Sequence, residues 1–130
     1  MVEVQTRFVA LAGDAELVAG TLDVQDGGAV TQLTNKSTGV TLNTHSGQIT
    51  MNAAELAAAA EATFTVTNST IAATDVVIVN HASAGTGGAY AVGITAVAAG
   101  SFDITVTNLS AGALSEAIVI NFVVIHGAAS

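Results

Sequence analysis

The chain of 130 residues contains no cysteine, no proline and no tryptophan. Without cysteine it forms no disulfide and offers no thiolate as nucleophile or metal ligand. Without proline, no position has its backbone fixed by a pyrrolidine ring. Four Phe and one Tyr are the only aromatic residues, so a core has to be built mainly from aliphatic side chains. A core rich in Val and Ile is typical of packed β-sheets.

Charge is also scarce, and positive charge most of all. Charged residues make up 9% of the chain, and Arg7 and Lys36 stand against ten acids, for a formal net charge of −8. Nucleic acids and anionic membranes are both bound through clustered Lys and Arg. This charge balance argues against either partner. A surface poor in charge and rich in Thr, Ser and Asn favours a protein that is partly covered in an assembly.

The sequence shows no targeting or membrane segment. Residues 1–10 carry Glu3 and Arg7 among apolar residues and lack the basic start and apolar run of a signal peptide. The longest strongly apolar run, residues 117–125, is interrupted by Asn121 and is shorter than the ~20 residues that span a bilayer. We therefore expect a soluble protein without an export signal.

Acidic residues divide the chain into two regions. Half of the ten acids fall within residues 1–29, and Gly27 and Gly28 end this acidic region. They are Glu3, Asp14, Glu16, Asp23 and Asp26. We predict that residues 1–29 form an N-terminal arm or strand pair and that residues 30–130 form a β-sandwich domain. The period-2 alternation over residues 2–10 favours strands; the alternative is an extended arm that orders only against a neighbour.

Beyond residue 29, short strand patterns alternate with turn clusters. Eight strands are expected, over residues 30–34, 39–43, 48–51, 62–68, 75–81, 89–98, 101–108 and 116–126. The second and third flank a turn at residues 45–47 and predict a hairpin. One short helical turn is expected over residues 52–60, with Asn52 as cap and Glu55 three residues later. The pattern predicts an all-β fold, a β-sandwich or jelly roll of about eight strands.

An internal repeat supports this fold. Residues 64–68 read F-T-V-T-N and residues 104–108 read I-T-V-T-N. They are followed by D-V-V-I-V-N at residues 75–80 and E-A-I-V-I-N at residues 116–121. We expect two related, hairpin-like units that pair across the sandwich by approximate symmetry.

The strands of the repeat differ in polarity. Residues 76–79 and 118–120 are continuous apolar runs, which are expected where both faces of a strand are covered. Residues 64–67 and 104–107 alternate with Thr and predict one core face and one polar face. Exposed strands that are apolar on both faces promote aggregation, so we expect the apolar runs to be buried in an oligomer.

No metal, cofactor or catalytic site is expected. His45, His81 and His126 are the strongest metal-ligand candidates, but they are far apart and have no second ligand at short spacing. His81 and His126 end the two related strands and so could lie near each other. Ordinary polar or interface histidines remain the preferred interpretation.

The other reactive side chains give no signature of an enzyme. Ser46 and Ser83 lie in turns, and no strand–turn–helix nucleophile elbow appears. Asp75 and Glu116 begin equivalent strands and are interpreted as a solvated strand edge; Glu55 and Glu61 form no convincing pair. The glycine-rich residues 84–88 lack the Lys-Ser/Thr of a phosphate-binding loop. The N-x-S/T tripeptides at Asn35, Asn68 and Asn108 are attributed to chance. We predict that the chain is not an enzyme.

Five segments carry a family resemblance. They are K-S-T-G-V-T-L-N at residues 36–43, S-G-Q-I-T-M-N at 46–52, F-T-V-T-N-S at 64–69, A-G-S-F-D-I-T-V-T-N at 99–108 and I-V-I-N-F at 118–122. On these segments residues 30–127, about three-quarters of the chain, resemble a β-rich domain of tailed-bacteriophage virion structural proteins. The resemblance implies an architectural role and brings no functional site residues.

Size decides which part of the virion is expected. One domain with a short N-terminal segment suits a capsid decoration (cement) protein, which needs only a compact oligomer and contacts to the shell. The resemblance then implies the major capsid protein as partner, a homotrimer by analogy with small cement proteins, and a location on the outer surface of the capsid. Residues 1–29 would reach a neighbouring subunit or the shell.

Two other functions stay open at this point. One is a tail- or head-fibre module that binds a receptor or carbohydrate through residues 83–88 and 110–115. The other is a bacterial surface or secreted β-protein.

Overall fold

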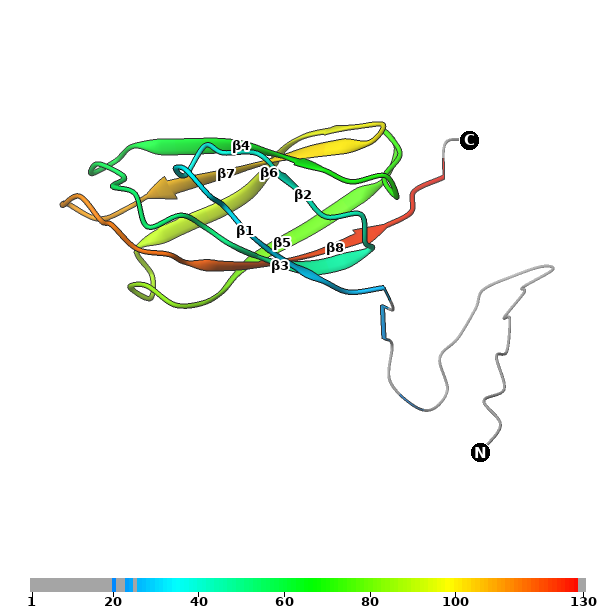
Figure 1. Cartoon of the computed structure of the whole chain (residues 1–130), viewed down its shortest axis with the longest axis horizontal. Helices are drawn as coiled ribbons and strands as arrows, with labels where there is room; N and C mark the ends of the chain where they lie inside the picture. The colour runs from blue at the N-terminus through cyan, green and yellow to red at the C-terminus, as the bar shows by residue number, and fades with distance from the viewer. Residues whose placement is uncertain (1–19, 21–22, 25, 129–130) are drawn as a thin grey trace.

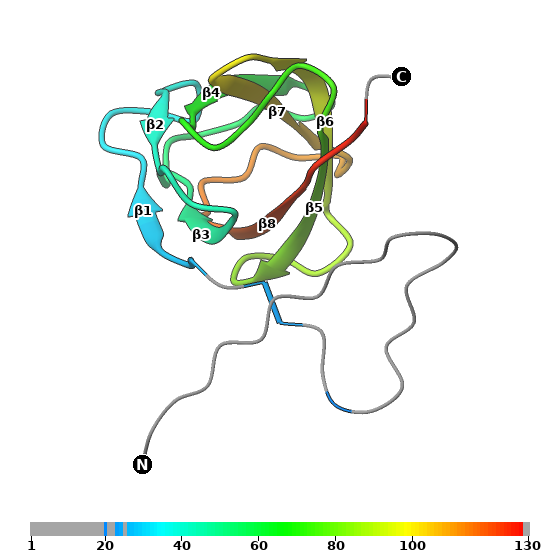
Figure 2. The ribbon, with the colours of Figure 1, turned by 90° about the vertical axis from the view of Figure 1, so that its right-hand side faces the viewer.

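The protein is a sandwich of two four-stranded sheets (Figure 1). The structure, a computed structural model, describes Gly20, Asp23, Val24 and residues 26–128. Most of the predicted N-terminal arm or strand pair therefore lies outside the described residues. Sheet A has the strand order β1-β3-β8-β5 and sheet B the order β2-β4-β7-β6. Viewed from the end, the two sheets curve around a common interior (Figure 2).

Each expected strand overlaps an observed one. Sheet A consists of β1 (Ala29–Thr31), β3 (Ser46–Thr50), β8 (Val119–Ile125) and β5 (Val76–Ser83). Sheet B consists of β2 (Val40–Thr41), β4 (Glu61–Thr67), β7 (Ser101–Asn108) and β6 (Tyr90–Ala98). The short edge pairs β1–β3 and β2–β4 are parallel, and the remaining pairs are antiparallel. The all-β sandwich of eight strands is confirmed.

Strict alternation explains why these segments form the two layers. Along β4 and β7 every second residue is buried, so Phe64, Val66, Phe102 and Ile104 face the interior while threonines face outward. The buried side chains of β8 in sheet A pack against them from the opposite side of the core. The ring of Phe102 lies 5.4 Å from that of Phe122 and joins the two sheets through the middle of the core.

The helix expected over residues 52–60 is wrong, since no described residue is helical. Leu56 instead forms an isolated antiparallel bridge with Leu114, and its side chain is buried in the core. Asn52 Oδ1 accepts a hydrogen bond from the Ala54 N–H, as in a turn rather than a helix cap. Burial of Leu56 in the core outweighs the helix propensity of the alanines, because a helix of nine residues is too short to offset the unfavourable free energy of nucleation.

The hairpin expected around residues 45–47 is also wrong. β2 and β3 lie in different sheets, and β2 pairs in parallel with β4. Residues 42–45 therefore carry the chain from sheet B to sheet A. At Gly47 the backbone of β3 passes close to the Phe122 ring. A Cβ at this position would lie 3.0 Å from Cε1 of the ring, so the approach requires glycine.

The two repeat units are not hairpins, and their equivalent strands pair within each sheet rather than across the sandwich. Each unit spans both sheets: β4 continues into β5, and β7 into β8. Equivalent residues pair with each other, Phe64 with Ile104 in sheet B and Asn80 with Asn121 in sheet A. Antiparallel partners are related by a local two-fold axis, so the equivalent residues of the repeat are related by approximate two-fold symmetry within each sheet.

The backbone follows the same symmetry at the ends of β4 and β7. The Asn68 N–H donates to the Gly100 carbonyl, and the Asn108 N–H donates to the Ala60 carbonyl. Both asparagine side chains are completely buried. Their Oδ1 atoms accept from the backbone N–H two residues later, as Asn35 Oδ1 does from Ser37. The three N-x-S/T tripeptides are therefore asparagine turns, and their origin is structural rather than chance.

No helix in the described part of the chain is long and apolar enough to cross a membrane.

Candidate functional site: the outer face of sheet A

The outward face of sheet B satisfies its own hydrogen bonds. Thr63 and Thr105, which lie opposite each other on β4 and β7, are joined hydroxyl to hydroxyl at 2.7 Å. Thr65 donates to Asp103 Oδ1 at 2.7 Å, and Thr95 lies 2.9 Å from Thr105. A polar ladder of this kind, with Asp103 among its members, is typical of a sheet face in water.

The outward face of sheet A is different, because its β5–β8 half is apolar. Val76 lies opposite Ile125, and Ile78 opposite Val123, on two adjacent strands. Val76, Ile78 and Ile125 are 55%, 51% and 50% exposed. These four residues are called the apolar patch below. The apolar runs at residues 76–79 and 118–120 thus leave one face uncovered in the single chain.

No charged residue lies among the outward positions of the four sheet A strands. Alternation along the strands places outward Ala29, Thr31, Ser46, Gln48, Thr50, Val76, Ile78, Asn80, Ala82, Val119, Asn121, Val123 and Ile125. The apolar patch is continued by short polar side chains toward β1. Lys36 is buried, so the described part of this acidic chain presents no Lys or Arg to solvent. A large uncharged face on an otherwise acidic protein is typical of a protein–protein interface.

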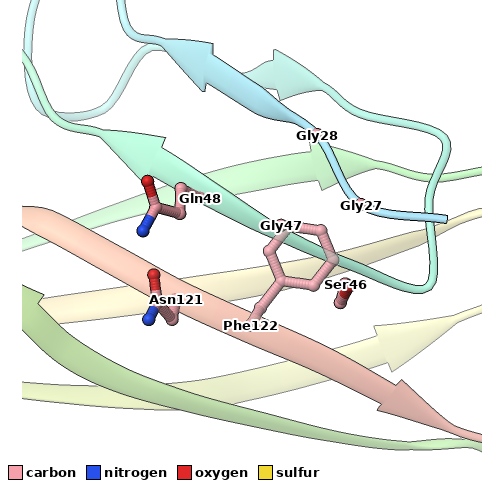
Figure 3. A pocket seen from close by; sticks show the side chains of 7 residues that line it. All are labelled: Gly27, Gly28, Ser46, Gly47, Gln48, Asn121 and Phe122. Carbon is pink, nitrogen blue, oxygen red and sulfur yellow. The ribbon is translucent and has the colours of Figure 1, made fainter. Parts of the chain in front are cut away.

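A shallow hollow of about 330 Å³ lies on this face beside the apolar patch (Figure 3). It is lined by Gly27, Gly28, Ser46, Gly47, Gln48, Asn121 and Phe122. Gln48 and Asn121 lie opposite each other on β3 and β8. Asn121 Oδ1 is buried and has no hydrogen-bond partner among the described residues. The hollow contains no titratable side chain, and its unpaired acceptor suits a donor from a partner rather than catalysis.

The aromatic side chains that the structure describes offer no platform for a sugar. Phe64, Tyr90, Phe102 and Phe122 are all buried, at most 8% exposed; Phe8 lies outside the described residues. Residues 83–88 and 110–115, the loops considered for receptor binding, meet at one end of the sandwich, where the Leu109 N–H donates to the Ala89 carbonyl. Within the described chain these loops carry no exposed aromatic ring.

The interpretation of Asp75 and Glu116 as a solvated strand edge is wrong for Asp75, which is 7% exposed. Asp75 accepts hydrogen bonds from the N–H groups of Ala72 and Gly127 and from His126 Nδ1. These bonds, that from Ala72 most of all, lower the pKa of Asp75. The carboxylate ties the start of β5 to the end of β8.

Glu116 has the matching role at the other end of these strands. Its carboxylate accepts from Thr86 N–H at 3.0 Å, from the Thr86 hydroxyl at 2.7 Å and from the Tyr90 hydroxyl at 2.8 Å. The bonds from Thr86 are the main cause that lowers the pKa of Glu116. Beneath it, Lys36 Nζ donates to the carbonyls of Asn52 and Glu116. Burial lowers the pKa of Lys36, and the charge of Glu116 opposes that effect.

The absorbance of the Tyr90 phenolate reports on this end of the fold, because Tyr90 is the only tyrosine in the chain. Burial, and then the hydrogen bond and charge of Glu116, raise its pKa from 10.0 to about 12. The folded state keeps the phenol protonated longer than the unfolded state does. The contribution of Tyr90 to the free energy of unfolding is therefore fully present below pH 10 and is lost as the pH rises toward about 12.

An absorbance titration of phenolate should accordingly give a midpoint near 12 for the folded protein. Glu116→Gln removes the negative charge and should move the midpoint back toward the ordinary value, while Glu55→Gln, remote from Tyr90 in these contacts, should leave it in place. A wild-type midpoint at the value of free tyrosine would contradict the buried contact.

The structure does not bring His81 and His126 together. β5 and β8 are antiparallel, and His81 lies opposite Ile120, six residues before His126, so the two histidines lie about 20 Å apart at the usual rise per residue. His81 instead stacks edge-on against Tyr90. His126 lies against His45, and the Nε2 atoms of the two rings are 3.1 Å apart. No sequence spacing signals this pair, because 81 residues separate its members.

The serines form no triad in the described structure. Ser46 Oγ donates to the Val24 carbonyl, and His81 Nε2 lies against the carbonyl oxygens of Ser83 and Ala84, not against a hydroxyl. Glu61 accepts only a long hydrogen bond, from Thr107.

No protein-family model matches this chain, and neither a curated protein nor a solved structure shows significant similarity to it. Its function has to be argued from its own surfaces.

Proposed function

We propose that this chain is a structural protein of a tailed-bacteriophage virion, bound to the outside of the capsid as a decoration protein. The observation that carries the proposal is the uncharged outer face of sheet A, with the apolar patch of Val76, Ile78, Val123 and Ile125 along its β5–β8 edge. Covering this face removes apolar surface from water, at roughly 25 cal/mol per Å². The family resemblance supplies the kind of partner, the major capsid protein.

The two faces of the sandwich suit opposite environments. Sheet A, uncharged and apolar, faces the capsid or a neighbouring copy in the proposed trimer. Sheet B, with its threonine ladder and the acidic Glu61 and Asp103, faces solvent. Binding to assembled capsomers but not to free ones stabilises the shell by mass action. The alternative, a carbohydrate-binding fibre module, is disfavoured because the described aromatic rings are all buried.

The copy number of the chain per major capsid subunit tests the proposal. Quantitative mass spectrometry of purified virions should give a ratio near one for a protein that covers the shell. A few copies per particle would place the chain at a vertex, tail or fibre instead. Its absence from the particles would contradict a virion role altogether.

A further inference from the structure

Four side chains from separate parts of the sequence form a continuous polar chain at one end of the sandwich. His45 Nε2 and His126 Nε2 lie 3.1 Å apart. His45 Nδ1 lies 3.2 Å from Asp26 Oδ2, and His126 Nδ1 lies 2.9 Å from Asp75 Oδ2. The chain enters the sandwich and β8 leaves it at this end, on the right of Figure 1.

The two Nε2 atoms face each other across 3.1 Å, with the ring planes at 83°. A carboxylate beside Nδ1 keeps the proton on that nitrogen and so fixes the tautomer that exposes a lone pair at Nε2. Carboxylate–histidine pairs of this kind orient the ligands of protein-bound zinc. Two imidazole nitrogens on one tetrahedral zinc, at about 2.0–2.1 Å each, are about 3.3–3.4 Å apart. The observed separation is close to that value.

Charge and access fit a cation as well. Asp26 and Asp75 carry two negative charges, which balance a divalent ion, and among the described residues each pairs with a histidine rather than with a Lys or Arg. The side chains of His45 and His126 are 35% and 56% exposed, so an ion reaches the pair from solvent. No third His, Cys, Asp or Glu completes the group within the described residues, so water fills the remaining coordination positions.

We propose that His45 and His126 form a two-histidine site for a divalent transition-metal cation of the zinc class, with Asp26 and Asp75 positioning the rings. Imidazole is a preferred ligand of zinc, copper and nickel. A bound ion links His45, just before β3, to His126, just after β8, while Asp26 and Asp75 hold the two rings from behind. The site is independent of the virion role proposed above.

Calorimetric titration of the tag-free protein with zinc sulfate tests the site. We expect one zinc ion per chain, and a rise in Tm of about 4–8 °C when free zinc is about four times Kd. His45→Gln and His126→Gln should each weaken binding at least tenfold. His81→Gln is the matched control: it removes the remaining histidine, at the other end of the sandwich, and should bind zinc as the wild type does.

Asp26→Asn guards against variants that merely misfold. Asp26 is exposed and touches no zinc, so its substitution should leave the zinc-free Tm unchanged while weakening binding roughly tenfold, as loss of a carboxylate behind a ligand does. Absence of zinc binding by the wild type at millimolar zinc would overturn the proposal. So would binding that survives both His45→Gln and His126→Gln; in either case the two nitrogens only share a proton.

Discussion

Replacing Asn108 by alanine should lower the free energy of unfolding by about 3–4 kcal/mol. The side chain is fully buried, and its Nδ2 donates to the carbonyls of Leu56, Ala57 and Gly112 at 2.9–3.1 Å. Its Oδ1 accepts from the N–H and hydroxyl of Ser110. Alanine removes these five hydrogen bonds, each of which contributes about 0.5–1.5 kcal/mol net. The carbonyls of Leu56, Ala57 and Gly112 keep one other donor each, whereas the buried turn loses the acceptor of the Ser110 N–H.

Two further variants calibrate this loss in urea unfolding. Asn68→Ala should cost less, about 2 kcal/mol, because Asn68 Nδ2 has one carbonyl partner, that of Thr44. Asn35→Ala removes the same kind of turn at an exposed position and should cost about 0.5 kcal/mol. Equal losses at Asn108 and Asn35 would show that burial of the turn does not matter.

Local pattern predicted the strands because each strand carries its own burial signal. The threonine alternation of β4 and β7 defines which side chains enter the core without knowledge of the partner strand. The repeat identified the related strands but not how they pair: it predicted pairing across the sandwich, whereas Phe64 pairs with Ile104 and Asn80 with Asn121 within the two sheets. The repeat also identified Asn68 and Asn108 as equivalent strand ends, but it did not predict that both side chains are buried.

Non-local choices were missed because nothing near them in the sequence decides them. β2 pairs with β4 rather than with β3. Val40 lies beside Val66, 26 residues further along the chain, although the predicted hairpin partner begins at Gln48, only 8 residues further. Leu56 leaves a helical pattern for a bridge to Leu114, 58 residues on. His45 and His126 meet only because the turn before β3 and the end of β8 reach the same end of sheet A. Burial of the apolar runs in an oligomer stays a prediction; the structure shows that the outer face of β5 and β8 is uncovered in the single chain.

Charging the apolar patch should abolish attachment to the capsid while leaving the fold intact. We expect the double variant Ile78→Lys/Val123→Glu to bind at least about a hundredfold more weakly, because desolvating two charges at an interface costs several kcal/mol per ion, which their attraction offsets only in part, and about 1.4 kcal/mol is a factor of ten. The two positions face each other on β5 and β8. Opposite charges there preserve strand pairing, so a loss of binding is not a loss of structure.

Thr63→Lys/Thr105→Glu is the matched control, since these residues face each other in the same way on sheet B. Cosedimentation of each variant with capsids stripped of the native chain measures binding, and a urea melt of each checks the fold. The sheet B variant should bind as the wild type does, because its threonine ladder already lies in a polar surrounding. The reverse outcome, with binding lost only from the sheet B variant, would move the interface to the threonine face. The uncharged outer face of sheet A would then need another partner, because its exposed Val76, Ile78 and Ile125 leave apolar surface in water that only an interface removes.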